Sequence, residues 1–146
     1  IREQGGAYSV DAGFLKNGMM YFGSGRDPNL KNTLDTFDQV ADFLRGYSPS
    51  DREMRKYILG SVSNLDHPLT NVMKAGISVG RYLSGISHEQ IQKIREEVLS
   101  TNAGDIRQYS SLVAEAMNKN CFAVVGGEQI IKEHQHLFGR IEGILE

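Results

Sequence analysis

A strict alternation of apolar and polar positions near the start of the chain predicts a β-strand. Apolar residues occupy every second position over Tyr8, Val10, Ala12 and Phe14, a period that is typical of a strand with one apolar face. Asn17-Gly18 follows, and these two residues tolerate the positive φ angles of a tight turn. Residues 19–22 are apolar again, so the pattern predicts an antiparallel hairpin.

Beyond the hairpin, apolar residues recur at helical spacing and predict five helices. These helices are expected over residues 30–46, 49–64, 69–83, 87–100 and 101–117. Ser48 is the expected N-cap of the second helix, with Pro49 at its first helical position. Asp66-His67-Pro68 should separate the second helix from the third, and Ser87 and Gln90 form the capping-box pair of the fourth.

The last part of the chain predicts one more strand and further helix. Residues 121–125 form a short apolar run before Gly126-Gly127, and residues 128–145 have helical spacing with an interruption at Gly139. The resulting fold class is α+β, with an antiparallel sheet made of the hairpin plus this late strand and covered by several helices. Residues 1–146 are expected to form a single domain. Three strands leave open edges, which indicates missing strands or a partner that supplies them.

Composition excludes several classes of function. The 146 residues carry a net charge of -2 with acidic and basic side chains intermixed, so neither nucleic acid nor a membrane surface is an expected partner. Cys121 is the only cysteine, which favours a reducing compartment, the cytoplasm or an organelle matrix. Because Cys121 stands in an apolar run, we expect a buried small residue and assign it no chemistry.

The histidines do not form a known zinc motif. The sequence His88-Glu89-Gln90-Ile91-Gln92 begins like the His-Glu-x-x-His helix, but Gln92 stands where the second histidine is needed. An inverted His-x-x-Glu-His motif ending at His134 would need a histidine where Ile130 stands. His134 and His136 would point to opposite sides of a helix, so we expect no metal site in this chain.

The segment from Arg2 to Tyr8 is the strongest candidate for chemistry. Gly5-Gly6 allows unusual backbone angles or close approach to a ligand, while Arg2 and Tyr8 bring a permanent cation and a neutral hydroxyl onto one short element. Such donors suit an oxygen that develops negative charge. From the residues alone, an arginine-capped hairpin without a catalytic role is the favoured interpretation.

The chain also resembles a known family in several ordered places. The sequence Arg2-Glu3-Gln4-Gly5-Gly6-Ala7-Tyr8 resembles the Arg-x-x-Gly-Gly-Ala-Tyr element in the C-terminal half of insulinase/pitrilysin metallopeptidases, in their presequence-protease branch. The segment from Ser24 to Asn29 is similar to the Ser-Tyr-Arg-Asp-Pro segment of that family, although Gly25 replaces the aromatic residue. Residues 58–69 and 123–128 are similar to later segments, in the same order.

This resemblance implies a fold and a function. The family is a clamshell of four related α+β domains, so residues 1–146 would be a partial copy, the truncated last domain of a multi-domain peptidase. Zinc would be bound by the missing N-terminal half, and a Glu from that half would be the general base. Arg2 and Tyr8 would assist at the substrate carbonyl, and Gly5, Gly6 and Ala7 would contact the substrate.

The expected function is therefore that of a fragment of a zinc metalloendopeptidase that degrades unstructured peptides. Its expected partners are the N-terminal half of the same polypeptide and a peptide substrate, and the fragment alone should be inactive and should self-associate through exposed apolar surface. Two other hypotheses stay open at this stage. One is a structural or partner subunit of the same family without a zinc motif, and the other is an unrelated α+β association domain.

Overall fold

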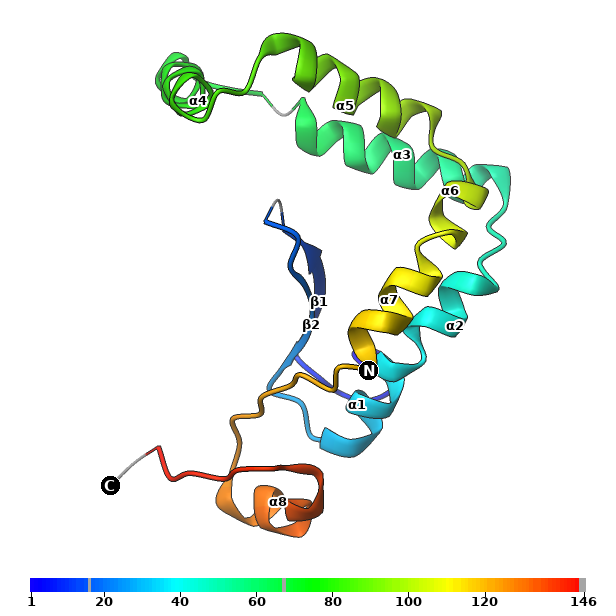
Figure 1. The fold of residues 1–146 in the computed structure, drawn as a ribbon, viewed down its shortest axis with the longest axis vertical. Coiled ribbons are helices and arrows are strands. Elements are labelled where there is room, and N and C mark those ends of the chain that lie inside the picture. Colours follow the sequence, from blue (N-terminus) through cyan, green and yellow to red (C-terminus); the bar gives the residue numbers. More distant parts are fainter. Residues whose placement is uncertain (16, 67, 145–146) are drawn as a thin grey trace. The chain divides into compact units, whose positions relative to one another are not determined.

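The computed structural model describes residues 1–15, 17–66 and 68–144. A β-hairpin near the start is followed by segments that are mostly helical (Figure 1), so the predicted α+β class is confirmed. The chain divides into two compact units, one formed by Ile1–Phe43 with Ser110–Glu146 and the other by Leu44–Tyr109. Among the described helices, none has the length and apolar character needed to cross a bilayer.

The hairpin of the first unit is made of β1 (Ser9–Phe14) and β2 (Met20–Gly25). The strands are antiparallel, with Ser9 opposite Gly25 and Phe14 opposite Met20. The turn is closed by a hydrogen bond from the Leu15 amide to the Met19 carbonyl at 2.8 Å. Gly18 has a φ of 84°, as expected for the predicted turn. The hairpin is confirmed, and its second strand continues to Gly25.

The apolar face of β1 is largely open in this chain. Tyr8, Val10 and Phe14 are all exposed, although their alternation predicts a face that packs on a core. On the second strand, Phe22 stacks on Phe37 with the ring centroids 5.7 Å apart. The hairpin is therefore packed through β2, and the side chains of β1 are left available for contact with something else.

The rest of the first unit is helical, with a small core. It contains α1 (Leu30–Asp38), α2 (Val40–Arg45), which runs into the second unit, α7 (Ser110–Met117), α8 (Glu128–Glu133) and the 3-10 turn η1 (Gln135–Leu137). The predicted helix over 30–46 is interrupted at Gln39. The described residues that are buried are Ala7, Thr33, Ala41, Ser110 and Val113. All five belong to this unit.

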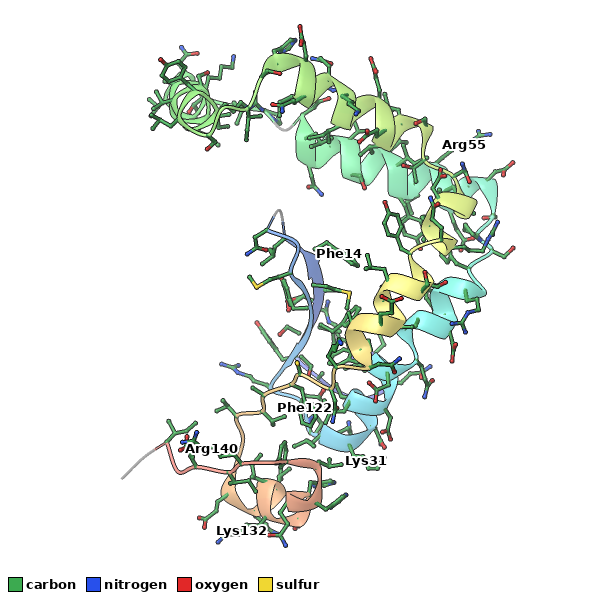
Figure 2. All side chains as sticks on the ribbon, viewed as in Figure 1. Phe14, Lys31, Arg55, Phe122, Lys132 and Arg140 are labelled. Atoms are coloured by element: carbon green, nitrogen blue, oxygen red, sulfur yellow. The ribbon has the colours of Figure 1, made fainter. Side chains whose placement is uncertain are left out.

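The solvent-facing sides of these helices carry local ion pairs. Lys31 lies 2.6 Å from Asp35 in α1, and Lys132 lies 2.5 Å from Glu128 in α8. Both lysines are labelled on their helices in Figure 2. Each pair joins residues four positions apart, the spacing that places side chains side by side on a helix. Exposed pairs of this kind add little to stability because water and salt screen the charges, so they do little to hold the unit together.

The predicted late strand over 121–125 is wrong. The structure assigns no strand to residues 121–127, and the described part of the chain has one sheet, which contains only β1 and β2. An apolar run becomes a strand only when another strand offers it hydrogen bonds. Here Phe122 packs instead against Phe138, with the ring centroids 5.8 Å apart. Cys121 is exposed rather than buried, because the segment that carries it joins no sheet.

The final helix is much shorter than predicted. Regular α-helix covers only Glu128–Glu133, and the chain continues through η1. The predicted interruption at Gly139 therefore comes after the α-helix has already ended. Leu145, the last residue of the predicted range, lies outside the described residues.

The second unit is built from helices whose starts are fixed by local side chains. It contains α3 (Asp51–Leu65), α4 (Asn71–Leu83), α5 (His88–Ser100) and α6 (Ala103–Arg107). The predicted capping box of Ser87 and Gln90 is present at α5. At α3 the cap is Ser50, which forms a capping box with Glu53, so the prediction of Ser48 is wrong. Ser50 is the N-cap because Glu53, three residues after it, completes the reciprocal hydrogen bonds of a capping box.

One of two further boundaries differs from the prediction. The predicted fifth helix is divided into α6 and α7 by a turn at Gln108 and Tyr109, and its cap is Asn102. The break between α3 and α4 lies where it was predicted, with Asp66 as the C-cap of α3. His67 lies outside the described residues.

Candidate functional site

The residues from Arg2 to Tyr8 form a closed loop at the edge of the hairpin. The Gly6 amide donates to the Arg2 carbonyl at 3.0 Å, and the Ala7 amide donates to the Ile1 carbonyl at 3.3 Å. Gly6 has a φ of 78°, in the left-handed region where side chains are strained. Ala7 is buried. The loop is therefore a defined structure in which Ala7 is the anchor.

Only glycine fits at position 5, because the backbone there lies close to the backbone of Ile1. A Cβ atom added at Gly5 would lie 2.4 Å from the Ile1 carbonyl oxygen. That contact is far shorter than a van der Waals distance, and the atom it meets is part of the backbone and cannot rotate away. The pair Gly5-Gly6 thus serves two different needs, space at Gly5 and a positive φ at Gly6.

The loop is fastened to the segment between β2 and α1. The Asn29 side-chain amide donates a hydrogen bond to the Gly5 carbonyl, across 24 positions of sequence. Asn29 is itself held because its backbone N–H donates to Asp27 Oδ1 at 2.9 Å. The other Asp27 oxygen accepts from the hydroxyl of the buried Thr33 at 2.6 Å. A chain of polar contacts therefore runs from the first turn of α1 to the Gly-Gly loop.

The charge of Asp27 is stabilised by these neighbours. Its partial burial would by itself raise the pKa, but hydrogen bonds from the Thr33 hydroxyl, the Asn29 backbone N–H and the Ser24 side chain lower it below its usual value. Hydrogen bonds to a carboxylate favour the charged form. Asp27 is thus an ionised acceptor at neutral pH, and its role here is to organise the turn.

Tyr8 is exposed and lies against Arg26. The Tyr8 amide donates to the Gly25 carbonyl at 3.1 Å, which places this residue at the end of the hairpin. The Arg26 guanidinium carbon lies 5.2 Å from the centre of the Tyr8 ring, within the range of a cation–π interaction. Tyr8 is 71% exposed. Its hydroxyl is therefore presented to the surroundings by a ring that touches a fixed cation.

The predicted site residues are thus brought together in part. Arg2 and Tyr8 stand at the two ends of one closed loop, and the side chains of both are exposed. Gly5, Gly6 and Ala7 shape that loop, as described above. Sequence reasoning missed Arg26 and Asn29 as members of the site, because their contacts to Tyr8 and Gly5 bridge residues far apart in the sequence. The only signal for them was the likeness of residues 24–29 to a family segment.

The two groups of histidines do not assemble a metal centre. His134 is the C-cap of α8 and His136 lies in η1, so their rings stack with centroids 6.4 Å apart. The expectation that they point to opposite sides is wrong, because the α-helix ends before His136. In the described part of the chain, no three His, Cys, Asp or Glu side chains are grouped to hold an ion.

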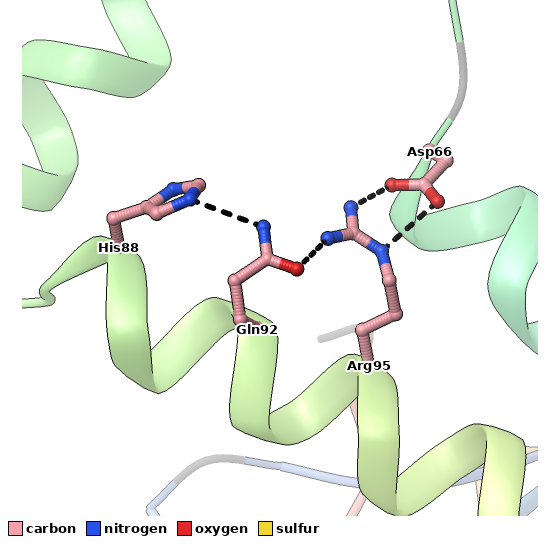
Figure 3. A network of polar contacts seen from close by, with 4 residues as sticks. All are labelled: Asp66, His88, Gln92 and Arg95. Carbon is pink, nitrogen blue, oxygen red and sulfur yellow. Dashed lines mark hydrogen bonds and ion pairs between the residues drawn. The ribbon is translucent and has the colours of Figure 1, made fainter.

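His88 belongs to a polar network that joins two helices. Its ring Nε2 lies 3.2 Å from the Gln92 amide nitrogen, and the Gln92 oxygen accepts from Arg95 at 2.5 Å. Arg95 forms a two-point ion pair with Asp66 at the end of α3 (Figure 3). Gln92, which breaks the zinc motif, is therefore part of the link between α5 and α3.

The geometry defines an α+β chain in which a glycine loop presents an arginine and a tyrosine beside a hairpin. Residues 1–127 match the family described as the PreP C-terminal domain. The chain belongs to this family.

Curated relatives give the same result. The chain is 36% identical over 146 residues to Protein HypA of Clostridium perfringens, covering 100% of this chain and 15% of that protein. It is 33% identical over 132 residues to Presequence protease 1, chloroplastic/mitochondrial, of Arabidopsis thaliana, covering 89% and 12%. It is 43% identical over 111 residues to a mitochondrial presequence protease of Emericella nidulans, covering 74% and 10%. The chain therefore spans only a small part of each relative.

Proposed function

We propose that this chain is the substrate-side part of a zinc-dependent metalloendopeptidase that degrades unstructured peptides. The observation that carries the proposal is the closed loop that presents Arg2 and Tyr8 as exposed donors at one end of the hairpin. Membership in a family whose relatives are named presequence proteases supports it. The role of this chain is to bind the peptide and assist at its scissile carbonyl.

The chemistry that the loop can contribute is electrostatic. Arg2 provides a guanidinium group with several N–H donors, and Tyr8 provides an O–H donor. Donors held in place before the reaction stabilise an oxygen on which negative charge develops, because they need no reorganisation at that moment. Gly5 and Gly6 have no side chains, so the backbone beside these donors can be approached closely by a peptide.

In this proposal, zinc is held by the N-terminal half of the same polypeptide. That half and the peptide substrate are the proposed partners, and the chain by itself is expected to be inactive. The open apolar residues of β1 and of α4, where Val72 and Tyr82 are among the most exposed, give the isolated chain a reason to self-associate. A reducing cytoplasm or organelle matrix is the proposed compartment.

The test uses the full-length polypeptide with zinc and a fluorogenic unstructured peptide. We expect Arg2→Ala and Tyr8→Phe each to lower kcat about 100-fold or more, the effect of removing one preorganised donor. Arg55→Ala and Tyr82→Phe are matched controls, because these side chains are exposed on α3 and α4. These two controls should leave kcat unchanged.

Two results would contradict the proposal. Full turnover in the double variant Arg2→Ala/Tyr8→Phe would show that the loop does not assist the reaction. A full-length wild-type protein that binds no zinc and cleaves no peptide would instead favour a structural or partner subunit of the same family.

A further inference from the structure

We infer that Arg26 is a positioning residue, whose guanidinium holds the Tyr8 ring in the orientation that presents its hydroxyl to the substrate. The inference rests on the proposed role of Tyr8 and deepens it. It starts from the contact between the two side chains, in which the Arg26 Cζ atom lies 5.2 Å from the centre of the Tyr8 ring.

An exposed tyrosine needs such a partner if its hydroxyl is to be preorganised. The backbone of Tyr8 is fixed by its hydrogen bond to Gly25, but a residue that is 71% exposed has few neighbours to hold its side-chain χ angles. A freely rotating Tyr8 side chain would lose conformational entropy each time its hydroxyl bound the substrate oxygen. A cation against the ring face restricts that freedom, because it is attracted to the ring at a defined position.

Arg26 is itself held in an unusual backbone conformation. Its φ is 49°, in the left-handed region that a residue with a Cβ enters at a cost. The next residue, Asp27, is fixed by the Asn29 backbone N–H and the buried Thr33 hydroxyl, at 2.9 and 2.6 Å. The surrounding turn therefore imposes this conformation, and the conformation directs the Arg26 side chain to Tyr8.

The turn that contains Arg26 and Asn29 contacts both the Gly-Gly loop and Tyr8. Asn29 holds the Gly5 carbonyl in the loop that begins with Arg2, while Arg26, three residues earlier, contacts Tyr8 at the end of that loop. The segment between β2 and α1 is thus a support for the donors, and Arg26 is its member that touches one of them.

The experiment is a double-mutant cycle between Arg26 and the Tyr8 hydroxyl in the full-length polypeptide. Arg26→Gly removes the side chain and suits the positive φ, so the turn should keep its fold. Tyr8→Phe keeps the ring and removes only the hydroxyl. With a fluorogenic peptide, Arg26→Gly should lower kcat about two- to five-fold with little change in KM, as a cation–π contact at an exposed position predicts. Arg26→Lys, which keeps the charge, should recover part of that loss.

The decisive measurement is the effect of Arg26→Gly in the Tyr8→Phe background. We expect no further loss of kcat there, because no hydroxyl remains to be positioned. An equal loss in both backgrounds, or no loss in the wild-type background, would overturn the inference. If Tyr8→Phe alone retained full turnover, the proposed function of Tyr8 would fail instead. A thermal melt of Arg26→Gly that is no lower than that of the wild type would exclude a purely structural effect.

Discussion

The loop at the start of the chain and the helix pair α3 and α5 are both fastened by polar side chains, but over different distances in the sequence. The two helices begin with capping boxes whose members are three residues apart, Ser50 with Glu53 and Ser87 with Gln90. The loop depends on Asn29, which reaches Gly5 across 24 positions. Local caps define the ends of elements, whereas the candidate site is defined by contacts that exist only after the chain has folded.

The loop and the helix α3 also differ in whether their glycines can be replaced by a residue with a side chain. At the loop, glycine is needed because the backbone returns to within contact of itself. In α3, Gly60 has nothing within 4 Å of where a Cβ would lie, so it is not required by the described structure. Three changes test this contrast between a region set by long-range contacts and a region set by local ones.

The largest effect is expected for Gly5→Ala. The new methyl would overlap the Ile1 carbonyl, so the loop must open, at a cost of about 2–3 kcal/mol as for other overpacked positions. Hydrogen exchange should show loss of protection at the Gly6 and Ala7 amides. Gly60→Ala is the control, and it should stabilise α3 by about 1 kcal/mol, because alanine favours a helix interior more than glycine does. Unchanged protection at Gly6 would contradict the steric argument.

A smaller effect is expected for Ser50→Ala, at the first turn of α3. This change removes the hydroxyl that accepts from the Glu53 amide at 3.3 Å, and loss of an N-cap costs about 1 kcal/mol. Ser48→Ala, two residues earlier, is a matched control and should cost less than half as much. Urea unfolding and amide exchange in α3 would measure both variants. Equal losses would mean that both serines contribute to the cap.

The smallest effect is expected from the ion pair between Asp66 and Arg95. The hydrogen bond from Arg95, aided by the Arg95 charge and opposed by partial burial, lowers the pKa of Asp66 below its ordinary value of 3.8. A carboxyl with a lower pKa in the folded state contributes stability that is fully present above the unfolded pKa and is lost as the pH falls through the folded pKa. The link between α3 and α5 should therefore weaken below about pH 4.

The variant Asp66→Asn tests this pH dependence. It should be slightly less stable than the wild type at pH 5–7, and the difference should vanish as the pH falls below about 4. Glu97→Gln is the control, because Glu97 is exposed and its ion pair with Lys93 spans 3.9 Å. Stability measured by urea unfolding across this pH range gives the result. A difference that persists undiminished at pH 2 would show that the charge of Asp66 is not responsible.

Sequence reasoning succeeded for the features that nearby residues decide. The hairpin was predicted from alternation and from Asn17-Gly18, since a tight turn needs residues that accept a positive φ. The start of α5 was predicted from Ser87 and Gln90, because a capping box is complete within four residues. The N-cap of α3 is predicted wrongly, because Pro49 favours Ser48 as the cap, whereas Glu53 completes the capping box of Ser50.

The predictions from sequence are wrong where contacts between residues far apart in the chain determine the structure. Residues 121–125 have the composition of a strand, but no strand in the described chain pairs with them, and Phe122 packs on Phe138 instead. The predicted helices over 30–46 and 101–117 are each divided in two. Periodicity could not reveal these breaks, since a turn of one or two residues hardly disturbs a helical pattern.

The sequence by itself identifies the residue types of the candidate site. Arg2, Gly5, Gly6 and Tyr8 carry a cation, two permissive backbone positions and a hydroxyl, and chemistry of this kind depends only on which residues are present. Their arrangement came with the fold, which brought Asn29 to Gly5 and Arg26 to Tyr8. A hydrogen bond or a ring contact needs two groups within a few ångströms, and only the folded chain brings groups far apart in the sequence that close together.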